Sequence, residues 1–472
     1  MFGVREGDLK KIVCILLMTG LLVVLVTGCG TQKTTSTNSS GTTYTPTFHA
    51  PAAQNGLVFK SPELQFQLLR AMGASAYNAA DIGECLVSAM QVDETQMEHG
   101  VFDSWYNAWN STAERLRSVA DQSLAGGHKT SARDTYLRCN TYYNMAEFYL
   151  HGNPSDPRIQ QASSSAVDCF NKAATLFDPP AELVSIKYEN TSLPGYFYRV
   201  DTSNKKRPLL IVQTGYDGTQ QELYSECAQA GLQRGYNVLS FEGPGQGQVL
   251  RKQGLHFRPD WEKVVTPVVD YAVSRKDVDP NKITLWGVSM GGYLAARAAA
   301  YEHRLKALIL DPAMDMAQVV VREFGPMMAG GDPNFKADVQ SMKAAFKQDP
   351  TAIDEGMIAA MNGNIGVTWF FQNGLFTFGG DSLSSLPLKM LDYNLAGVTP
   401  KISATTLVCD SEQDVEKYGS MTKDIYNDLK CPKKYILFTN AEGAGAHCEM
   451  GAEKFAGQQK LDWLAGVVGN KD

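Results

Sequence analysis

Residues 283–300 read ITLWGVSMGGYLAARAAA. An apolar run comes first, the pentapeptide GVSMG follows at 287–291, and an alanine-rich segment comes last. This is the G-x-S-x-G pattern between a strand and a helix, which is typical of a nucleophile elbow. A serine on so sharp a turn needs backbone angles that bulky neighbours would obstruct, so glycine stands two residues away on either side. The stretch therefore predicts that Ser289 is a nucleophile. The alternative is a glycine-rich turn in which Ser289 only caps the helix.

Apolar runs that favour strands recur on both sides of this stretch. They lie at 183–188, 195–200, 208–214, 236–241, 282–288, 305–310, 404–409 and 434–438. Helix-like stretches at 220–234, 260–275 and 293–303 lie between several of them. Alternating strands and helices predict an α/β fold with a mostly parallel sheet. Eight strands with the serine turn after the fifth match the order of the α/β-hydrolase fold.

One interval between strands, residues 312–402, is far too long for a simple loop. It contains helix-like stretches at 323–329, 335–347 and 351–362, and the aromatic run Trp369-Phe370-Phe371. We interpret it as a helical lid inserted above the carboxyl ends of the strands, where α/β proteins place their sites. A structural elaboration that faces away from the site is the alternative.

The chain before the sheet is helical in pattern. Apolar residues at three-and-four spacing predict helices over 62–72, 79–90, 102–125, 131–151 and 164–177. We therefore divide the chain into a helical N-terminal cap domain at 58–180 and a hydrolase domain at 181–472. The aromatic residues of the front, such as Tyr142 and Phe148, are interpreted as packing between helices.

A serine nucleophile needs a histidine base and a carboxylate that orients it. In this fold the chain order is serine, acid, histidine. His303 and His447 follow Ser289, and His447 lies in the glycine-containing loop after the last strand, so His447 is the predicted base. The predicted acid is Asp414, a few residues past the seventh strand; Asp410 and Asp311 are the alternatives.

The backbone N–H groups of Met290 and Tyr216 are the predicted oxyanion hole, because one donor follows the nucleophile and the other lies after the third strand. Gly215 permits a close backbone approach there. Glu242, in a glycine-rich loop after the fourth strand, either contacts substrate or supports the site, and Asp217 is a second candidate for substrate binding.

The front end indicates export. Basic residues precede the apolar run Ile12 to Thr27, which is too short for a comfortable membrane span. Small residues then lead into Cys29, as in a bacterial lipobox, where the cysteine is acylated. We read 1–28 as a lipoprotein signal peptide and 29–57 as a Ser/Thr-rich disordered tether. The expected location is the outer face of a bacterial cell membrane, held by a lipid anchor at Cys29. An uncleaved signal anchor is the alternative.

Composition excludes several function classes. The chain has a formal net charge of −7 and no basic run, which argues against nucleic acid as a partner. Seven cysteines follow Cys29 without C-x-x-C spacing, so no metal site is expected. The loop 242–247 lacks the spacing of a phosphate or dinucleotide motif, and no cofactor is expected. The expected partner is a small-molecule substrate; a homodimer is left open.

Several segments resemble the FrsA-like branch of α/β-hydrolases, which includes the 2,6-dihydroxypseudooxynicotine hydrolase and the fungal yellowish-green pigment hydrolases. They are GHKTSARDTYLR at 127–138 and AEF at 146–148 in the helical front, FEGPGQG at 241–247, WGVSMGG at 286–292 and EGAGAHC at 442–448. The resemblance covers about residues 60 to 467. It implies a Ser-Asp-His hydrolase with a helical N-terminal cap, and Ser289, Asp414 and His447 lie at the matching positions.

The expected activity is hydrolysis of an ester, or of a C–C bond next to a ketone, through an acyl-enzyme. Known relatives of the branch cleave such bonds, although the lipoprotein-like leader is unusual among relatives that act on intracellular metabolites. Two alternatives stay open from the sequence: an exported peptidase, and a surface lipoprotein that binds without catalysis on a hydrolase fold.

Overall fold

The computed structural model describes residues 36–37, 43–44, 56–96, 98–329 and 336–470. The predicted signal peptide, Cys29 and most of the tether lie outside the described residues. Two short strands, β1 (Ser36–Thr37) and β2 (Thr43–Tyr44), pair antiparallel. No helix in the described part of the chain is long and apolar enough to cross a membrane.

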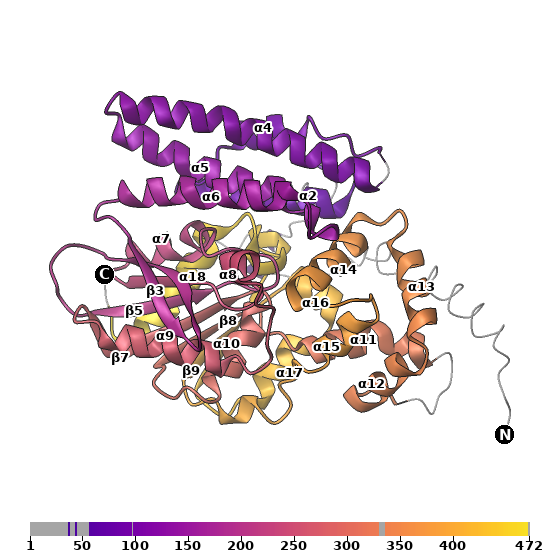
Figure 1. The fold of residues 1–472 in the computed structure, drawn as a ribbon. Coiled ribbons are helices and arrows are strands. Elements are labelled where there is room, and N and C mark those ends of the chain that lie inside the picture. Colours follow the sequence, from indigo (N-terminus) through magenta and orange to yellow (C-terminus); the bar gives the residue numbers. More distant parts are fainter. Residues whose placement is uncertain (1–35, 38–42, 45–55, 97, 330–335, 471–472) are drawn as a thin grey trace, which may run out of the picture.

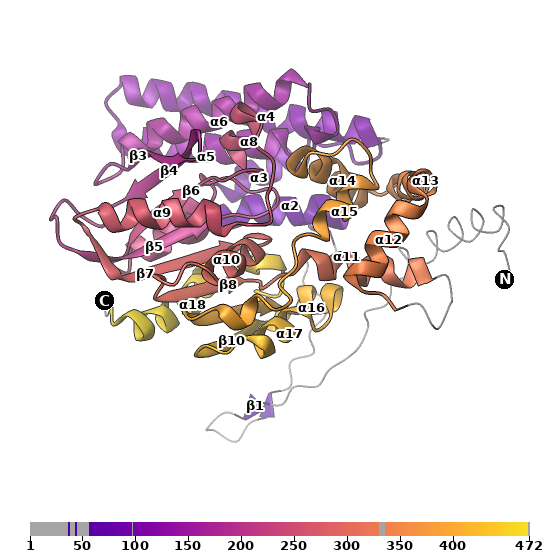
Figure 2. The ribbon, with the colours of Figure 1, turned by 60° about the horizontal axis from the view of Figure 1, so that its bottom comes forward.

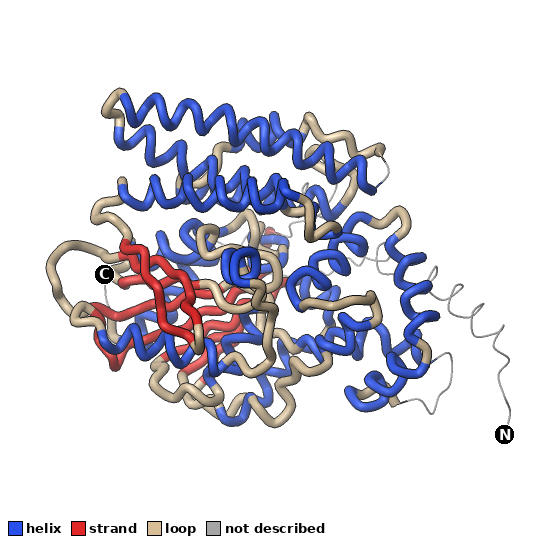
Figure 3. Tube along the Cα trace, viewed as in Figure 1, coloured by secondary structure: helices blue, strands red, loops and turns tan. Residues whose placement is uncertain are grey.

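An eight-stranded, mostly parallel sheet confirms the predicted fold class. Its strands are β3 (Glu182–Tyr188), β4 (Thr191–Tyr198), β5 (Arg207–Gln213), β6 (Asn237–Phe241), β7 (Val278–Val288), β8 (Ala307–Asp311), β9 (Thr405–Ser411) and β10 (Lys433–Phe438). Their spatial order is β10-β9-β8-β7-β5-β6-β4-β3. Only the β3–β4 and β4–β6 pairs of this sheet are antiparallel. Figure 3 shows the strands of the sheet in red with the helices around them in blue.

Alternate side chains of each central strand point to opposite faces of the sheet and pack into two different hydrophobic cores, because side chains in a strand have a period of two residues. Leu209 and Ile211 pack with α9 (Glu262–Ser274) and α10 (Gly291–Ala299). Leu210 and Val212 belong to the core that contains residues of α7 (Gln229–Leu232) and α18 (Glu453–Val468). The central strands are therefore covered by helices on both faces (Figure 1).

Five helices of the N-terminal region lie across the α7 side of the sheet, in indigo and purple in Figure 1. They are α2 (Pro62–Gly73), α3 (Ile82–Ala89), α4 (Glu98–Ala125), α5 (Lys129–Glu147) and α6 (Pro157–Thr175). Aromatic side chains fill the space between them: the rings of Trp109 and Tyr142 lie 5.6 Å apart, and Trp105 donates to the Met145 carbonyl at 2.6 Å. These aromatic residues pack between helices, as the sequence indicates.

The described residues of the interval between β8 and β9 form five α-helices at one end of the sheet (Figure 2). They are α11 (Met316–Ala329), α12 (Val339–Gln348), α13 (Pro350–Met361), α14 (Ile365–Phe378) and α15 (Ser385–Met390). The aromatic run at 369–371 lies within α14. Trp369 stacks on Phe148 of the N-terminal helical region with ring centroids 5.0 Å apart, so the insertion and that region are in contact. The other α-helices of the described residues are α8 (Gly247–Gln253), α16 (Glu412–Tyr418) and α17 (Met421–Asp428).

Candidate active site

The turn after β7 has the geometry of a nucleophile elbow. Ser289 has a φ of 59°, a left-handed conformation that non-glycine residues rarely adopt. Its N–H donates to the Asp311 carbonyl at 2.6 Å, and its carbonyl accepts from the Gly292 N–H at 2.8 Å. A Cβ atom on Gly287 would overlap the carbonyl oxygen of Gly291, which explains the glycine before the serine. The strained turn places the Ser289 side chain at the carboxyl edge of the sheet.

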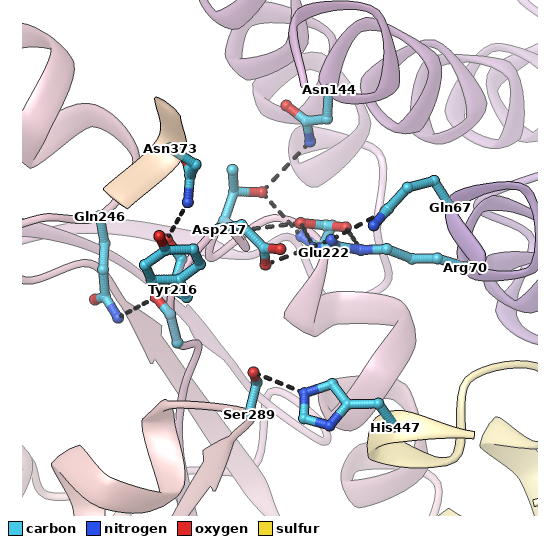
Figure 4. Close-up of polar contacts among 12 residues, drawn as sticks. Gln67, Arg70, Asn144, Tyr216, Asp217, Glu222, Gln246, Ser289, Asn373 and His447 are labelled. Carbon is cyan, nitrogen blue, oxygen red and sulfur yellow. Dashed lines mark hydrogen bonds and ion pairs between the residues drawn. The ribbon is translucent and has the colours of Figure 1, made fainter. Parts of the chain in front are cut away.

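The structure brings Ser289, His447 and Asp414 into one hydrogen-bonded chain. The His447 Nε2 lies 2.9 Å from the Ser289 Oγ (Figure 4), and its Nδ1 lies 2.8 Å and 2.9 Å from the two carboxylate oxygens of Asp414. The Asp414 side chain is 5% exposed, whereas that of His447 is 27% exposed. A carboxylate that accepts from Nδ1–H leaves Nε2 free to accept the serine proton, which is the arrangement that nucleophilic catalysis needs.

Local structure fixes Asp414 in this position. Ser411 caps the N-terminus of α16, and its Oγ accepts from the Asp414 N–H at 3.3 Å. Enclosure of the His447 imidazole lowers its pKa, but the charge and hydrogen bond of Asp414 raise it by more, so the net pKa lies above the usual 6.5. The pair therefore stabilises the imidazolium that forms when His447 takes a proton.

The other candidate acids point elsewhere. Asp410 accepts a hydrogen bond from the Tyr435 hydroxyl at 2.9 Å, and burial raises the pKa of its carboxyl to about 6. Asp311 is 2% exposed and pairs with the buried ammonium of Lys460, which also pairs with Glu449. Neither carboxylate is bonded to His447, so the two alternatives to Asp414 do not fit the geometry.

The loop after β5 lies directly against the elbow. A Cβ atom on Gly215 would lie 2.6 Å from the backbone nitrogen of Met290, so only glycine permits this approach. The Thr214 and Gly215 carbonyls accept from the Gln246 side chain at 2.7 Å and 3.5 Å, and the Tyr216 carbonyl accepts from Asn373 at 3.2 Å (Figure 4). The loop that carries Tyr216 and the helix that begins beside Met290 thus adjoin, as an oxyanion hole requires.

The carboxylate of Glu242 is bonded to the backbone of two neighbouring segments. Glu242 is fully buried, and its carboxylate accepts from the backbone N–H groups of Gln220 at 3.2 Å and Gln248 at 2.7 Å. Burial raises the pKa of this carboxyl, while the two N–H groups lower it. Of the two roles left open by the sequence, the structure favours support over substrate contact, because both oxygens are engaged by backbone.

Asp217 lies at the edge of the site. Its carboxylate is 3.4 Å from a guanidinium nitrogen of Arg70, which also pairs with Glu222 at 2.9 Å (Figure 4). The charge of Asp217 is among the influences that raise the pKa of His447. Substrate binding by Asp217 stays a prediction.

The sequence did not reveal three polar residues that bond to one another or to residues beside the site. Lys460 lies in α18, and Asn373 lies in α14. His151 lies in the segment between α5 and α6. All three are buried. A polar residue inside a strongly apolar helix, such as Asn373 in WFFQNGLF at 369–376, is a signal that marks such positions.

The sequence profile of the alpha/beta hydrolase family matches residues 215–454. The 20-hydroxy-prefusarin hydrolase of Gibberella moniliformis is 30% identical over 429 residues, which are 86% of this chain and 97% of that protein. Hydrolase acrC of Aspergillus aculeatus is 32% identical over 439 residues, 86% of this chain and 96% of that protein. The crystal structure of the 2,6-dihydroxy-pseudo-oxynicotine hydrolase superposes with a TM-score of 0.63 at 19% identity, covering 85% of this chain and 97% of that one. This last likeness concerns the fold alone.

Proposed function

Because this chain belongs to the alpha/beta hydrolase family and is a hydrolytic enzyme, we propose that it acts as a serine hydrolase with Ser289, His447 and Asp414 as its triad. The observation that carries the proposal is the unbroken chain from the Ser289 Oγ through both His447 nitrogens to the Asp414 carboxylate. Its three members lie in the segments that follow three different strands, β7, β9 and β10.

The proposed mechanism follows from these contacts. The Ser289 Oγ attacks a carbonyl carbon while the His447 Nε2 takes its proton, and Asp414 stabilises the imidazolium. The N–H groups of Met290 and Tyr216 bind the oxyanion; losing one such donor typically costs about 100- to 1000-fold in turnover. His447 then returns the proton to the leaving group. Water, activated by the same histidine, releases the acyl group from Ser289.

The proposed substrate is a small molecule with an ester, or with a C–C bond next to a ketone. In the second case the bonding electron pair passes to the leaving carbon, the neighbouring ketone delocalises it as an enolate, and the proton held by His447 completes the ketone product. Alignments over almost the whole length of fungal hydrolases support membership in the FrsA-like branch, since they include the helical front. One of these relatives is named a hydrolase of 20-hydroxy-prefusarin, a small molecule.

We propose in addition that residues 58–180 and 312–402 act as a cap and a lid over the serine. Support comes from the contacts of α14 with both neighbours: Trp369 stacks on Phe148, and Phe370 stacks on Tyr216 with ring centroids 5.5 Å apart. These contacts support a lid that packs on the loop beside the elbow over an insertion that faces away from it.

The activity is tested with the full-length protein in detergent against p-nitrophenyl esters and a β-diketone such as benzoylacetone. We expect turnover of at least one class, and loss of that turnover in Ser289→Ala. If the folded wild-type protein hydrolysed neither class, or if the variant retained wild-type turnover, the proposal would be overturned.

Export and lipidation at Cys29 remain a proposal that the leader sequence alone supports. Bacterial cells that express the full chain are grown with an alkyne analogue of palmitate, and the label is measured in the membrane fraction. We expect label on the wild-type protein and none on Cys29→Ala. Equal labelling of both proteins, or wild-type protein in the soluble fraction, would contradict the proposal.

A further inference from the structure

Asn373 is a fully buried polar residue in the middle of α14. Its Nδ2 donates to the Tyr216 carbonyl at 3.2 Å (Figure 4), and its Oδ1 accepts from the His151 Nδ1 at 2.8 Å. A backbone carbonyl can only accept, so the nitrogen of the amide must face Tyr216 and its oxygen must face His151. His151 therefore carries a proton on Nδ1. This one amide joins the insertion to the loop beside Ser289 and to the N-terminal helical region.

The hydrogen bond from Asn373 to the Tyr216 carbonyl lies next to the Tyr216 N–H along the backbone. That N–H shares a planar peptide unit with the Gly215 carbonyl, and the Tyr216 carbonyl belongs to the next unit along the chain. Before this N–H, Gln246 donates to the Thr214 carbonyl at 2.7 Å and, over a longer distance of 3.5 Å, to the Gly215 carbonyl. After it, Asn373 donates to the Tyr216 carbonyl. With a hydrogen bond on each side, rotation of the intervening N–H is restricted.

A buried network holds Asn373 in turn. The His151 Nε2 lies 3.0 Å from a Glu147 carboxylate oxygen and 3.3 Å from the Arg251 guanidinium, and Arg251 itself pairs with Glu147. The His151 ring also stacks on Phe376 of α14, with ring centroids 4.4 Å apart. Because buried polar groups are costly to leave unpaired, this network favours one position of the Asn373 side chain.

We propose that Asn373 is a positioning residue for the oxyanion hole. Through the Tyr216 carbonyl it aims the Tyr216 N–H at the developing oxyanion, so the site is complete only when α14 lies against the loop. The inference rests on the proposed function, since it assigns the Tyr216 N–H to the oxyanion. In this proposal the insertion contributes to catalysis through the side-chain amide of Asn373.

The test compares Asn373→Leu with Thr377→Val in the full-length protein. Thr377 is a buried polar residue one turn further along α14, and among the described residues its hydroxyl donates only to the Asn373 carbonyl of the same helix. Four quantities are measured: kcat and KM on a p-nitrophenyl ester, and the inhibition constants of a trifluoromethyl ketone and of its methyl ketone. The fluorinated ketone adds to the Ser289 Oγ, the serine proton passes to His447, and the resulting hemiketal presents an oxyanion.

We expect Asn373→Leu to lower kcat by about 10- to 100-fold, less than deletion of an oxyanion donor, with KM within about two-fold of wild type. Trifluoromethyl ketone binding should weaken by the same factor, while methyl ketone binding stays unchanged. Thr377→Val should leave all four quantities within about two-fold. The proposal is wrong if Asn373→Leu retains the wild-type kcat and trifluoromethyl ketone affinity, or if only KM changes.

The wild-type protein is the control that distinguishes failure of the proposed function from failure of the role of Asn373. Wild-type protein that turns over neither the ester nor the β-diketone and does not bind the fluorinated ketone would overturn the proposed function, and this inference with it. Reactive wild-type protein with an equally reactive Asn373→Leu would overturn the inference alone. If the leucine variant does not fold by circular dichroism, Asn373→Asp takes its place, because it keeps the volume and loses the donor to Tyr216; the same losses are expected.

Discussion

The backbone carbonyl of Asp311 accepts a hydrogen bond from the Ser289 N–H at 2.6 Å. The same carbonyl accepts from the Cys448 thiol at 3.4 Å, one residue after His447. Both ends of the nucleophile–base pair thus depend on the last residue of β8. The side chain of Asp311 is held by Lys460, which reaches it from α18 and also binds Glu449. Cys448 and Glu449 both adopt positive φ angles, and these contacts stabilise that conformation.

Replacement of Lys460 should therefore be strongly destabilising. Lys460→Met leaves the buried carboxylates of Asp311 and Glu449 without their cation, and breaking a buried ion pair typically costs about 3–5 kcal/mol. We expect a lower free energy of unfolding at neutral pH, measured in urea. Lys454→Met, on an exposed position of the same helix, should cost less than about 1 kcal/mol. Equal stability of the two variants would contradict this role for Lys460.

Asp414→Asn should change both the rate and its pH dependence. Loss of the carboxylate should lower kcat by on the order of 10⁴-fold, as for the corresponding change in other triads. Activity needs neutral His447, so kcat/KM rises with pH through the pKa of His447. Asp414 raises that pKa and enclosure lowers it, so the variant's rise should shift to lower pH. Asp410→Asn is the matched control and should leave the midpoint of the rise unchanged. If the midpoint shifted in the Asp410 variant alone, Asp414 would not be the acid that orients His447.

Gly215→Ala should disable the site without unfolding the protein. The added Cβ would lie 2.6 Å from the Met290 nitrogen, so the loop and the elbow must separate. We expect kcat to fall by about 100-fold or more, since both oxyanion donors are displaced. Gly466→Ala, where an added Cβ meets nothing within 4 Å, should keep the wild-type kcat. Wild-type kcat in Gly215→Ala would show that the approach of the two segments is unimportant.

Ionisation of the buried Asp410 carboxyl should lower the free energy of unfolding as pH rises. Its pKa is raised to about 6, chiefly by burial, so the native protein holds this proton more tightly than the unfolded chain does. Stability contributed by the protonated form is present below about pH 4 and is lost as pH rises toward about 6. Asp410→Asn should therefore be about 1–2 kcal/mol more stable than wild type at pH 8 and no more stable at pH 3.5. Urea unfolding at the two pH values checks the sign; a variant less stable at pH 8 would contradict it.

Much of the fold was predictable because its signals are local. The eight strands lie where apolar runs occur, although β7 begins earlier, at Val278, and α11 begins at Met316 instead of near Glu323. Strand runs buried on both faces stand out from the helical periodicity around them. Element boundaries depend on contacts made by the folded chain, and the sequence pattern locates them less well.

The site was predictable where chain order restricts the choices. Ser289, His447 and Asp414 follow the strand ends in the order that the fold requires, and the structure brings them together. The role of Asp311 was not decidable from the sequence, because its partner Lys460 lies 149 residues further along the chain. Glu242 was ambiguous for the same reason, since two backbone N–H groups of the folded chain occupy its carboxylate.

The most direct test of the central claim is the intact mass of the full-length protein after reaction with a fluorophosphonate probe, with Ser289→Ala beside it. We predict one stoichiometric adduct on the wild-type protein, mapped to Ser289 by peptide analysis, and none on the variant. An adduct of equal yield on Ser289→Ala, or no adduct on folded wild-type protein, would contradict the assignment of Ser289 as the nucleophile.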